Sequence, residues 1–355
     1  MNLAEVIDGL VEERGLDRDL VTTIVCDGIA SAYAKKYPDL DFKATYNKKT
    51  GKLEIFTEKE VMQVVTDDDY EISAKKVKTL HPTAELGAMV MIPFEGAIGR
   101  IEILAAKQLI STKIRDLELL AVYNDYKDKQ GTIVTGLVHK RERAGWVVKI
   151  GEVLGLLPKE NLVDAESVRI GHQVKVLLQE VLQTVRGDNY QLIFDRVSPE
   201  FVQKLLELEI PEIFEGMVEI KKIVRIAGYK SKAIVASNSK EIDPVGTCVG
   251  VGGSRIKPIL RELGQEKVDL IEWTDSIEDL VRDCLKPAEI DKVLVEHNRA
   301  VVLLAEDQRS YAIGKMGQNI LLASKLSGME IQLQDLAQTS SGESEQSGIE
   351  EDHVA

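Results

Sequence analysis

The sequence predicts a multidomain α+β protein, in which an α+β front domain precedes a small β-barrel and two copies of one α/β module. Three observations predict this class. Helix-like and strand-like periods alternate in the first third of the chain, and five short apolar runs separated by glycines follow the polar break KDKQG. From residue 200 onward, one order of helices, strands and a glycine turn occurs twice. At 355 residues, the chain is long enough for several domains.

The front domain is predicted to span 1–128. Apolar residues at helical spacing mark a first helix within 1–15, and a second helix begins after the N-cap Asp17 and ends before Pro38. Residues 42–73 alternate as strands do. A long helix is expected over 101–126, with an inward apolar stripe formed by Ile103, Ala106, Ile110, Ile114, Leu117 and Ala121.

The second domain is predicted to span 129–198. Its five runs are GTIVTGLVHK, GWVVKIG, GLLPKENL, QVKVLLQEVL and YQLIFDRV, and strands of this length and spacing suit a small Greek-key barrel.

The third and fourth domains, 199–275 and 276–338, each carry a G-x-x-G turn between two helices. Glycine lets another backbone approach closely, and the first N–H groups of the following helix are suited to phosphate. The predicted phosphate-binding residues lie in the two turns and just after them: Gly250, Val251, Gly252, Gly253, Ser254, Arg255 and Lys257, and then Gly314, Lys315, Met316, Gly317, Gln318 and Asn319. In KH modules such a turn holds about four nucleotides of single-stranded backbone.

The sequence does not favour three other interpretations of the glycine turns: chance occurrence, a dinucleotide-binding motif and an ATP-binding loop. A single G-x-x-G among 26 glycines is expected by chance, but the repeat of the turn 64 residues later, in the same order of elements, is not. A dinucleotide-binding G-x-G-x-x-G would need glycine where Arg255 stands, and no ATP-binding G-x-x-x-x-G-K-[ST] occurs.

Charge weighs against simple nucleic-acid binding, because the chain carries a formal net charge of −14. The stretch 219–257 reverses this locally, with eight Lys and Arg against three Asp and Glu. Either this stretch forms a local basic site for phosphate, or it is an ordinary solvated surface; the sequence leaves both open.

Several function classes find no support in the sequence. The histidines and the three cysteines are scattered, and no nucleophile elbow is present, so we expect no catalytic site, no metal and no cofactor. Membrane spans and a signal peptide are missing from the pattern, so a cytoplasmic location is expected. Residues 339–355 are rich in Ser, Gly and Glu, which is typical of a disordered acidic tail.

The repeat region resembles the bacterial NusA family of transcription termination and antitermination factors. The resemblance is carried by DPVGTCVG and by AIGKMGQNILLAS, and the barrel resembles an S1 (OB-type) domain through GWVVKI followed by GLLP. It implies two tandem type II KH domains behind a front domain that docks on RNA polymerase. It also implies a monomer that holds nascent single-stranded RNA, modulates pausing, termination and antitermination, and works with further antitermination factors.

The resemblance also suggests where contacts are made. On the barrel it implicates Arg141, Arg143, Trp146 and Lys149, although Trp146 and Phe194 could instead simply fill the core. On the helix 101–126 it implicates Lys107, Ser111, Arg115 and Glu118 as contacts to polymerase.

The chain departs from the family pattern in three ways. Gly252 and Met316 stand where basic residues are usual, and the chain corresponds to a short form without C-terminal acidic repeats. An RNA-processing enzyme and a ribosome-associated scaffold, each using S1 and KH parts as tethers, stay open as alternatives.

Overall fold

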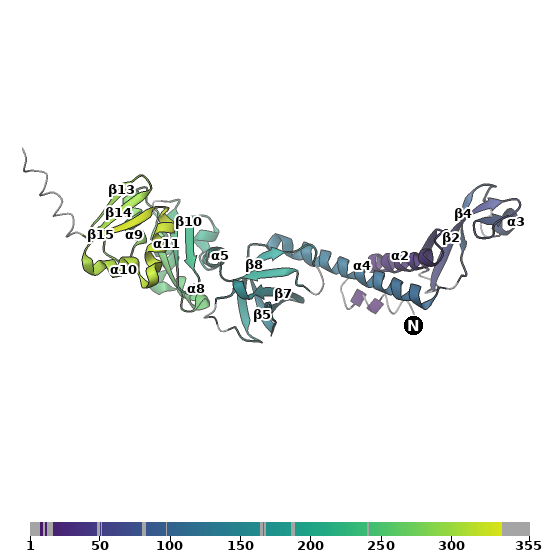
Figure 1. Cartoon of the computed structure of the whole chain (residues 1–355), viewed down its shortest axis with the longest axis horizontal. Coiled ribbons are helices and arrows are strands. Elements are labelled where there is room, and N and C mark those ends of the chain that lie inside the picture. The colour runs from purple at the N-terminus through teal and green to yellow at the C-terminus, as the bar shows by residue number, and fades with distance from the viewer. Residues whose placement is uncertain are drawn as a thin grey trace, which may run out of the picture. The chain divides into compact units, whose positions relative to one another are not determined.

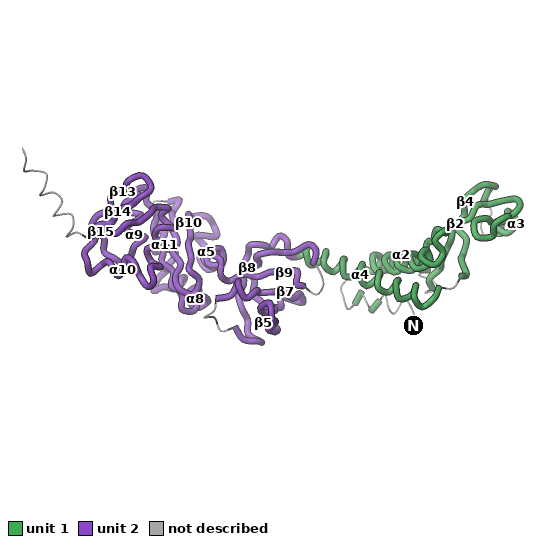
Figure 2. The backbone as a smooth tube through the Cα atoms, in the orientation of Figure 1, with its two compact units in different colours: residues 1–125 green, residues 126–355 purple. Residues whose placement is uncertain are grey.

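The computed structural model divides the chain into two compact units, residues 1–125 and 126–355 (Figure 2). The structure describes residues 8–9, 11–12, 17–47, 50, 52–79, 83–96, 98–163, 166, 168–185, 189–239 and 241–335. Most of the predicted first helix and the whole predicted acidic tail, 339–355, lie outside the described residues.

The first unit combines long helices with a four-stranded sheet (Figure 1). Helix α2 (Arg18–Lys36) begins where predicted, because the Asp17 side chain accepts hydrogen bonds from the Asp19 and Leu20 amides. Its strands and one short helix are β1 (Phe42–Asn47), β2 (Lys52–Met62), β3 (Glu71–Ser73), α3 (Ala74–Val77) and β4 (Met89–Pro93). Strand β2 is the centre of the sheet, since it pairs with β1, β3 and β4.

Helix α4 (Arg100–Tyr126) confirms the predicted long helix, but only part of the predicted stripe faces inward. Ala106 and Ile114 are buried, and Ile114 contacts Val21 and Val25 of α2 in one apolar cluster. Ile103 is 52% exposed and Ala121 is also exposed, so for these two positions the prediction was wrong. A straight helix turns 100° per residue, and a stripe of 19 residues therefore drifts off the face that its partner covers.

The barrel is closed in the order β5-β6-β7-β9-β8. Its strands are β5 (Ile133–Arg141), β6 (Gly145–Ile150), β7 (Val153–Pro158), β8 (Gln173–Val181) and β9 (Leu192–Asp195), which confirms the five predicted runs. Closure removes the free strand edges and buries alternate residues, among them Val147, Leu157 and Phe194.

The first α/β module begins with α5 (Pro199–Glu209) and the short α6 (Pro211–Phe214). Strands β10 (Val218–Ile226) and β11 (Lys230–Ser237) form an antiparallel pair, and β12 (Lys267–Glu272) adds to β11 in parallel. Between β11 and β12 lie α7 (Pro244–Val249), the glycine turn η3 (Val251–Gly253) and α8 (Ile256–Leu263).

The second module repeats this order with fewer residues. It consists of α9 (Ile277–Cys284), β13 (Lys292–Glu296), β14 (Arg299–Leu304), η4 (Glu306–Gln308), α10 (Arg309–Ile313), the turn η5 (Lys315–Gly317), α11 (Gln318–Ser327) and β15 (Glu330–Asp335). Its sheet has the same pairing, antiparallel β13 and β14 followed by parallel β15. The predicted internal repeat is therefore confirmed at the level of topology.

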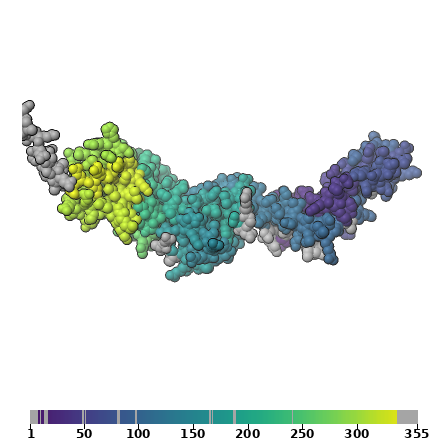
Figure 3. Space-filling model, viewed as in Figure 1, coloured from purple at the N-terminus to yellow at the C-terminus, as the bar shows by residue number. Residues whose placement is uncertain are grey.

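The two modules share one hydrophobic core. A single cluster joins Ile234 and Ile271 of the first module to Leu280, Ala323 and other residues of the second, and α11 lies against β10 and β11. Lys232, fully buried, places its Nζ 3.0 Å from Asp269 Oδ2 and 3.2 Å from the Lys286 carbonyl oxygen. In the space-filling view the two modules form one continuous surface on the face shown (Figure 3). Their relative position is thus fixed by packing.

Among the described residues, no helix is long and apolar enough to cross a membrane.

Candidate nucleic-acid interface

The first glycine turn has a backbone that only glycine adopts easily. Gly250 has φ 72° and ψ 165°, and Gly252 and Gly253 also have positive φ values, 60° and 77°. A Cβ on Gly250 would lie 2.8 Å from Ser254 Oγ and 2.9 Å from Arg255 Cγ. The turn is closed by a hydrogen bond of 3.0 Å from the Gly253 amide to the Gly250 carbonyl. Glycine is therefore required here for two reasons: the backbone has positive φ, and at Gly250 the side chains of Ser254 and Arg255 lie too close for a Cβ.

The second turn has the same conformation at each corresponding position. Gly314 has φ 70° and ψ 179°, and Gly317 has φ 74°. Met316, at the position of Gly252, keeps φ 55° and ψ 26° although it is not glycine. The Gly317 amide donates to the Gly314 carbonyl at 3.2 Å, as in the first turn. The same turn is thus built twice, from two different sequences.

A side chain at one shared position ties each turn to the preceding helix. Arg255, five residues after the first glycine, donates from Nη1 to the Thr247 carbonyl at 2.7 Å and from Nη2 to Glu212 Oε1 at 2.8 Å. Asn319, at the corresponding position, donates from Nδ2 to the carbonyls of Tyr311, Ala312 and Leu285 at 3.1–3.2 Å.

The sequence predicts Arg255 and Asn319 to be among the residues that face RNA. The structure instead engages the Arg255 guanidinium within the protein and leaves Asn319 only 3% exposed. The signal that could have revealed this role is their equal spacing from the first glycine of each turn.

The predicted residues that reach solvent form the tips of the turns. Val251 is 96% exposed and Met316 is 87% exposed. Lys257 in the first turn of α8 and Lys315 within the second turn are exposed, so each turn carries one lysine near its tip. Ser254 is exposed, and Gln318 is partly buried. The surface offered to a ligand is therefore backbone, one lysine and an apolar tip at each turn.

Most of the predicted basic stretch, 219–257, is neutralised by acids. Five of its eight cationic side chains form ion pairs: Lys221 with Glu219, Arg225 with Glu266, Lys230 and Lys232 with Asp269, and Arg255 with Glu212. Arg225 and Glu266 have side chains that are 1% and 0% exposed, so their charges support the fold. Lys222 and Lys257 are exposed, and Lys240 lies outside the described residues. Among its described residues, these ion pairs leave the stretch without a continuous basic surface.

The barrel offers a smaller set of polar and aromatic groups. Arg141 and Trp146 are paired across β5 and β6, and the Arg141 guanidinium lies 5.4 Å from the centre of the Trp146 ring. Trp146 is partly exposed and lines a hollow of about 310 Å³ together with Arg141 and Lys159. Arg143 is exposed, whereas Lys149 forms an ion pair of 2.9 Å with Glu152.

The sequence left open that Trp146 and Phe194 simply fill the core of the barrel. This alternative holds for Phe194. Phe194 is fully buried and packs within 2.4 Å of where a Cβ on Gly155 would lie. Trp146 is partly exposed and lies beside Arg141.

On α4, the candidate contact residues follow one side of the helix. Lys107, Ser111 and Arg115 are exposed, and Glu118 is partly buried. Large apolar side chains are exposed on the same helix, among them Ile101 at 74% and Leu104 at 65%. The helix therefore presents both charged and apolar groups to solvent.

Cysteine and metal chemistry contribute nothing visible to this interface. Within the described ranges, no group of three or more His, Cys, Asp or Glu residues could hold a metal ion. Burial raises the pKa of the Cys248 thiol to about 11 and that of Cys284 to about 12. Both thiols are therefore protonated, and unreactive, near neutral pH.

Family models match three parts of the chain. The NusA N-terminal domain matches residues 2–119, the NusA-like first KH domain matches 196–273, and the NusA-like second KH domain matches 277–341. Both KH matches include one of the glycine turns described above.

Relatives extend the similarity along nearly the whole chain. The transcription termination/antitermination protein NusA of Halalkalibacterium halodurans is 33% identical over 99% of this chain and 91% of its own length. The proteins of the same name from Bacillus subtilis and Thermus thermophilus are each 32% identical over 93% of this chain, and over 90% and 89% of their own lengths. The three family-model matches and this identity place the chain in one family: it belongs to the NusA family of transcription termination/antitermination proteins.

Proposed function

We propose that this protein is a non-enzymatic transcription factor that binds RNA polymerase and nascent single-stranded RNA, and so modulates pausing, termination and antitermination. The observation that carries the RNA half of the proposal is the pair of glycine turns with one backbone conformation. The names of the relatives support the transcription half. Neither an RNA-processing enzyme nor a ribosomal scaffold is favoured by any specific observation.

In this proposal the turns hold RNA mainly through the backbone. The first N–H groups of a helical turn have no intrahelical acceptor, and α8 and α11 both begin directly behind a turn. A phosphate oxygen can accept from these amides while Lys257 or Lys315 supplies one positive charge. The apolar tips, Val251 and Met316, can contact ribose or base faces. Such a site binds RNA by shape and phosphate rather than by reading many base edges.

The barrel provides a further contact, centred on Arg141, Arg143 and Trp146. An exposed tryptophan face can stack on any base, and a nearby guanidinium can pair with a phosphate. Lys149 contributes less, because Glu152 neutralises it.

The front unit supplies the polymerase contact in this proposal, through Lys107, Ser111, Arg115 and Glu118 on α4. In this proposal the domain 1–128 binds polymerase, and the domains 129–198, 199–275 and 276–338 bind RNA. We take the protein to act as a cytoplasmic monomer. It needs no cofactor in this proposal, because neither RNA binding nor polymerase binding requires a cofactor.

The RNA half is tested by placing carboxylates at the tips of both turns. Val251→Asp, Gly252→Asp, Lys315→Asp and Met316→Asp together should weaken RNA binding about tenfold or more, because the new charges repel phosphate. The matched control carries Asn at the same four positions and has the same size without the charge. Among residues other than glycine, Asp and Asn tolerate the positive φ at 252 and 316 well.

Fluorescence anisotropy with single-stranded RNA measures the affinity, and thermal unfolding checks the fold. Equal affinity of the Asp and Asn variants would remove the turns from the RNA site.

The transcription half is tested by the dwell time of the cognate bacterial RNA polymerase at a hairpin pause. The wild-type protein should lengthen the pause. The variants Lys107→Glu and Arg115→Glu should not. No change in dwell time, with RNA binding intact, would contradict the role in pausing.

A further inference from the structure

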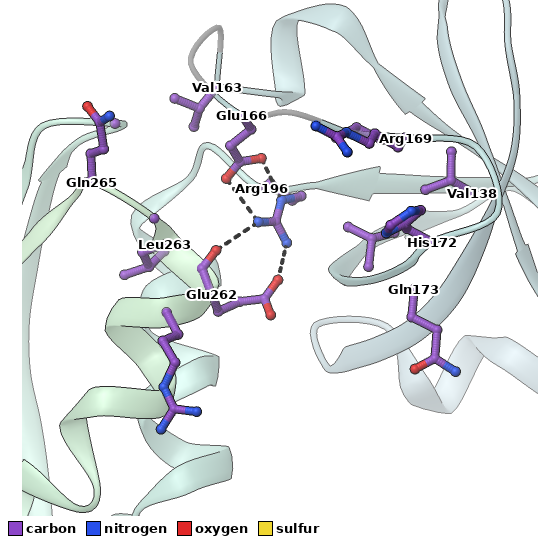
Figure 4. A pocket seen from close by; sticks show the side chains of 15 residues that line it. Val138, Val163, Glu166, Arg169, His172, Gln173, Arg196, Glu262, Leu263 and Gln265 are labelled. Atoms are coloured by element: carbon purple, nitrogen blue, oxygen red, sulfur yellow. Dashed lines mark hydrogen bonds and ion pairs between the residues drawn. The ribbon is translucent and has the colours of Figure 1, made fainter.

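A cleft of about 350 Å³ lies where the barrel meets the first KH module (Figure 4). The barrel contributes Val163, Glu166 and residues 168–174 in part, and the KH module contributes Arg261 to Gln265, at and just after the end of α8. The two modules touch closely at its floor, since a Cβ on Gly228 would lie 2.6 Å from Val163 Cγ1. The cleft is therefore a fixed feature of the second unit.

Arg196 stands at the centre of this cleft and is fully occupied (Figure 4). Its Nε and Nη2 donate to the two carboxylate oxygens of Glu166 at 2.8 and 2.9 Å, and Nη1 donates to Glu262 Oε1 at 2.7 Å. Further bonds reach the carbonyl oxygens of Lys175 and Glu262. All five N–H donors of the guanidinium are used. Arg196 thus joins the barrel to the KH module and cannot itself bind a ligand.

Two other arginines of the cleft have no such partner. Arg169 and Arg261 are exposed, and within the described part of the chain no hydrogen bond or ion pair holds either guanidinium. With Arg196 they bring three positive charges, against Glu166 and Glu262, whose carboxylates are already bound to Arg196. The lining residues therefore carry a net charge of +1 in a protein of −14.

Polar side chains complete the lining. His172, Gln173 and Gln265 can donate to and accept from a ligand, and Val138 and Val168 offer apolar walls. This combination suits a nucleotide, whose phosphate is anionic and whose base has an apolar face with polar edges.

The cleft continues into the hollow beside Trp146. The two cavities share Val163, Glu166 and Val168 as lining residues, so they adjoin. The second adds Arg141 and Lys159, with no further acid. Together they form a groove, from here called the junction groove, that runs from the barrel aromatic Trp146 to Arg261 at the end of α8. Four arginine or lysine side chains other than Arg196 line it.

We propose that the junction groove binds the backbone of the same single-stranded RNA that the glycine turns hold, with Arg169 and Arg261 each pairing with one phosphate. This inference rests on the proposed function. Helix α8 carries the first glycine turn at its start and Arg261 in its last turn, and its eight residues span about 12 Å. One strand can therefore contact both ends of this helix and continue along the groove to stack on Trp146.

The test replaces both unpartnered arginines in the full chain, Arg169→Gln and Arg261→Gln. The control, Lys52→Gln and Lys292→Gln, removes the same charge from two exposed strand positions outside the groove and the turns. Binding of a single-stranded RNA of about 30 nucleotides, long enough for one barrel site and two KH sites, is measured at several salt concentrations.

Two lost phosphate contacts should lower the slope of log affinity against log salt by about 1.4, and raise Kd about tenfold at low salt. The control should change neither quantity. Adenosine monophosphate and inorganic phosphate, each titrated alone, should bind the wild type no more tightly than the double variant. Tight binding of either one that the double variant loses, while its RNA affinity stays unchanged, would assign the groove to a free nucleotide or phosphate and overturn the proposal.

A slope equal to that of the wild type would also overturn it. That result would leave the proposed function intact if the Asp substitutions in the glycine turns still weaken binding. If the wild-type protein binds no RNA at all, both proposals fail together.

Discussion

In the first KH module the glycine turn is fastened by Arg255, and in the second it is fastened by Asn319. Both residues lie five positions after the first glycine, and each donates to the carbonyl three residues before that glycine, Thr247 or Tyr311. Arginine reaches that carbonyl from the surface, with Glu212 as a second partner, whereas asparagine does so from the interior with three carbonyl acceptors. The turn therefore needs a hydrogen-bond donor to this backbone carbonyl, and two different side chains can supply it.

The tips of the turns differ in strain. Gly252 adopts its positive φ without steric cost, while Met316 holds nearly the same angles against the preference of a side chain. The second module also has an exposed lysine inside the turn, which the first lacks. The second turn thus combines a strained backbone with a nearby charge, and the first is unstrained but carries its lysine, Lys257, in the following helix.

The largest effects are expected at the first glycine of each turn. Gly314→Ala should destabilise the protein by about 3 kcal/mol and Gly250→Ala by about 2 kcal/mol, because φ near 70° with ψ near 180° is open almost only to glycine. The greater cost at Gly314 follows from the added Cβ, which would lie 2.6 Å from Asn319 Cβ and 3.1 Å from its backbone nitrogen. At Gly250 the nearest atoms belong to side chains that can move.

Urea unfolding of the full chain measures both values. Gly317→Ala, at positive φ but with no atom within 4 Å of the new Cβ, is the control and should cost about 1 kcal/mol. Equal costs at all three glycines would show that conformation alone, and not close approach, sets the requirement.

Smaller effects are expected at the two fastening residues. Asn319→Ala should cost about 2 kcal/mol, because it leaves the buried carbonyls of Leu285 and Ala312 without this donor. Arg255→Ala should cost about 1 kcal/mol, since the Arg255 side chain is one-third exposed and water can replace it. Thermal or urea unfolding gives the values, with Asn298→Ala at an exposed position as the control. A cost for Arg255→Ala that exceeds the cost for Asn319→Ala would reverse the comparison.

The smallest effects concern the two buried thiols, Cys248 in α7 and Cys284 in α9. Burial raises their pKa values from 9.0 to about 11 and about 12, so the folded protein keeps protons that the unfolded chain releases. This contribution to stability is fully present below pH 9 and falls as the pH rises toward the folded values.

Between pH 8 and about pH 10, each thiol should remove about 1 kcal/mol from the free energy of unfolding. Unfolding curves of the wild type and of Cys248→Ala and Cys284→Ala, compared over this range, isolate the two contributions. Parallel pH profiles of all three proteins would contradict the assignment to these thiols.

The sequence was sufficient for the order of elements, because helix caps, strand runs and glycine turns are local signals. Asp17 as a cap, the five barrel strands and the repeated module all rest on residues close together in the chain. The fate of the basic stretch was not predictable in this way, since Glu266 and Asp269 neutralise Arg225 and Lys232 from about 40 residues away.

The candidate site was predicted in outline for the same reason. The positions of the two turns followed from their glycines, but the burial of Asn319 depends on α9 and α10, which pack around it. The junction groove was not anticipated, because Arg169 and Arg261 come from different domains and only the docking at Arg196 brings their segments together.

The shared core of the two KH modules, with α11 against β10 and β11, has a consequence for the length of RNA between two bound segments. Once one turn holds the strand, the other turn is presented at a fixed distance, and the second contact becomes intramolecular. Its effective concentration is then set by the nucleotides that connect the two contacts. A connector too short to span the distance allows one contact only, and a longer one loses affinity gradually with its length. In the proposed RNA-bound state, the affinity therefore depends on the spacing between the two RNA segments that the turns hold.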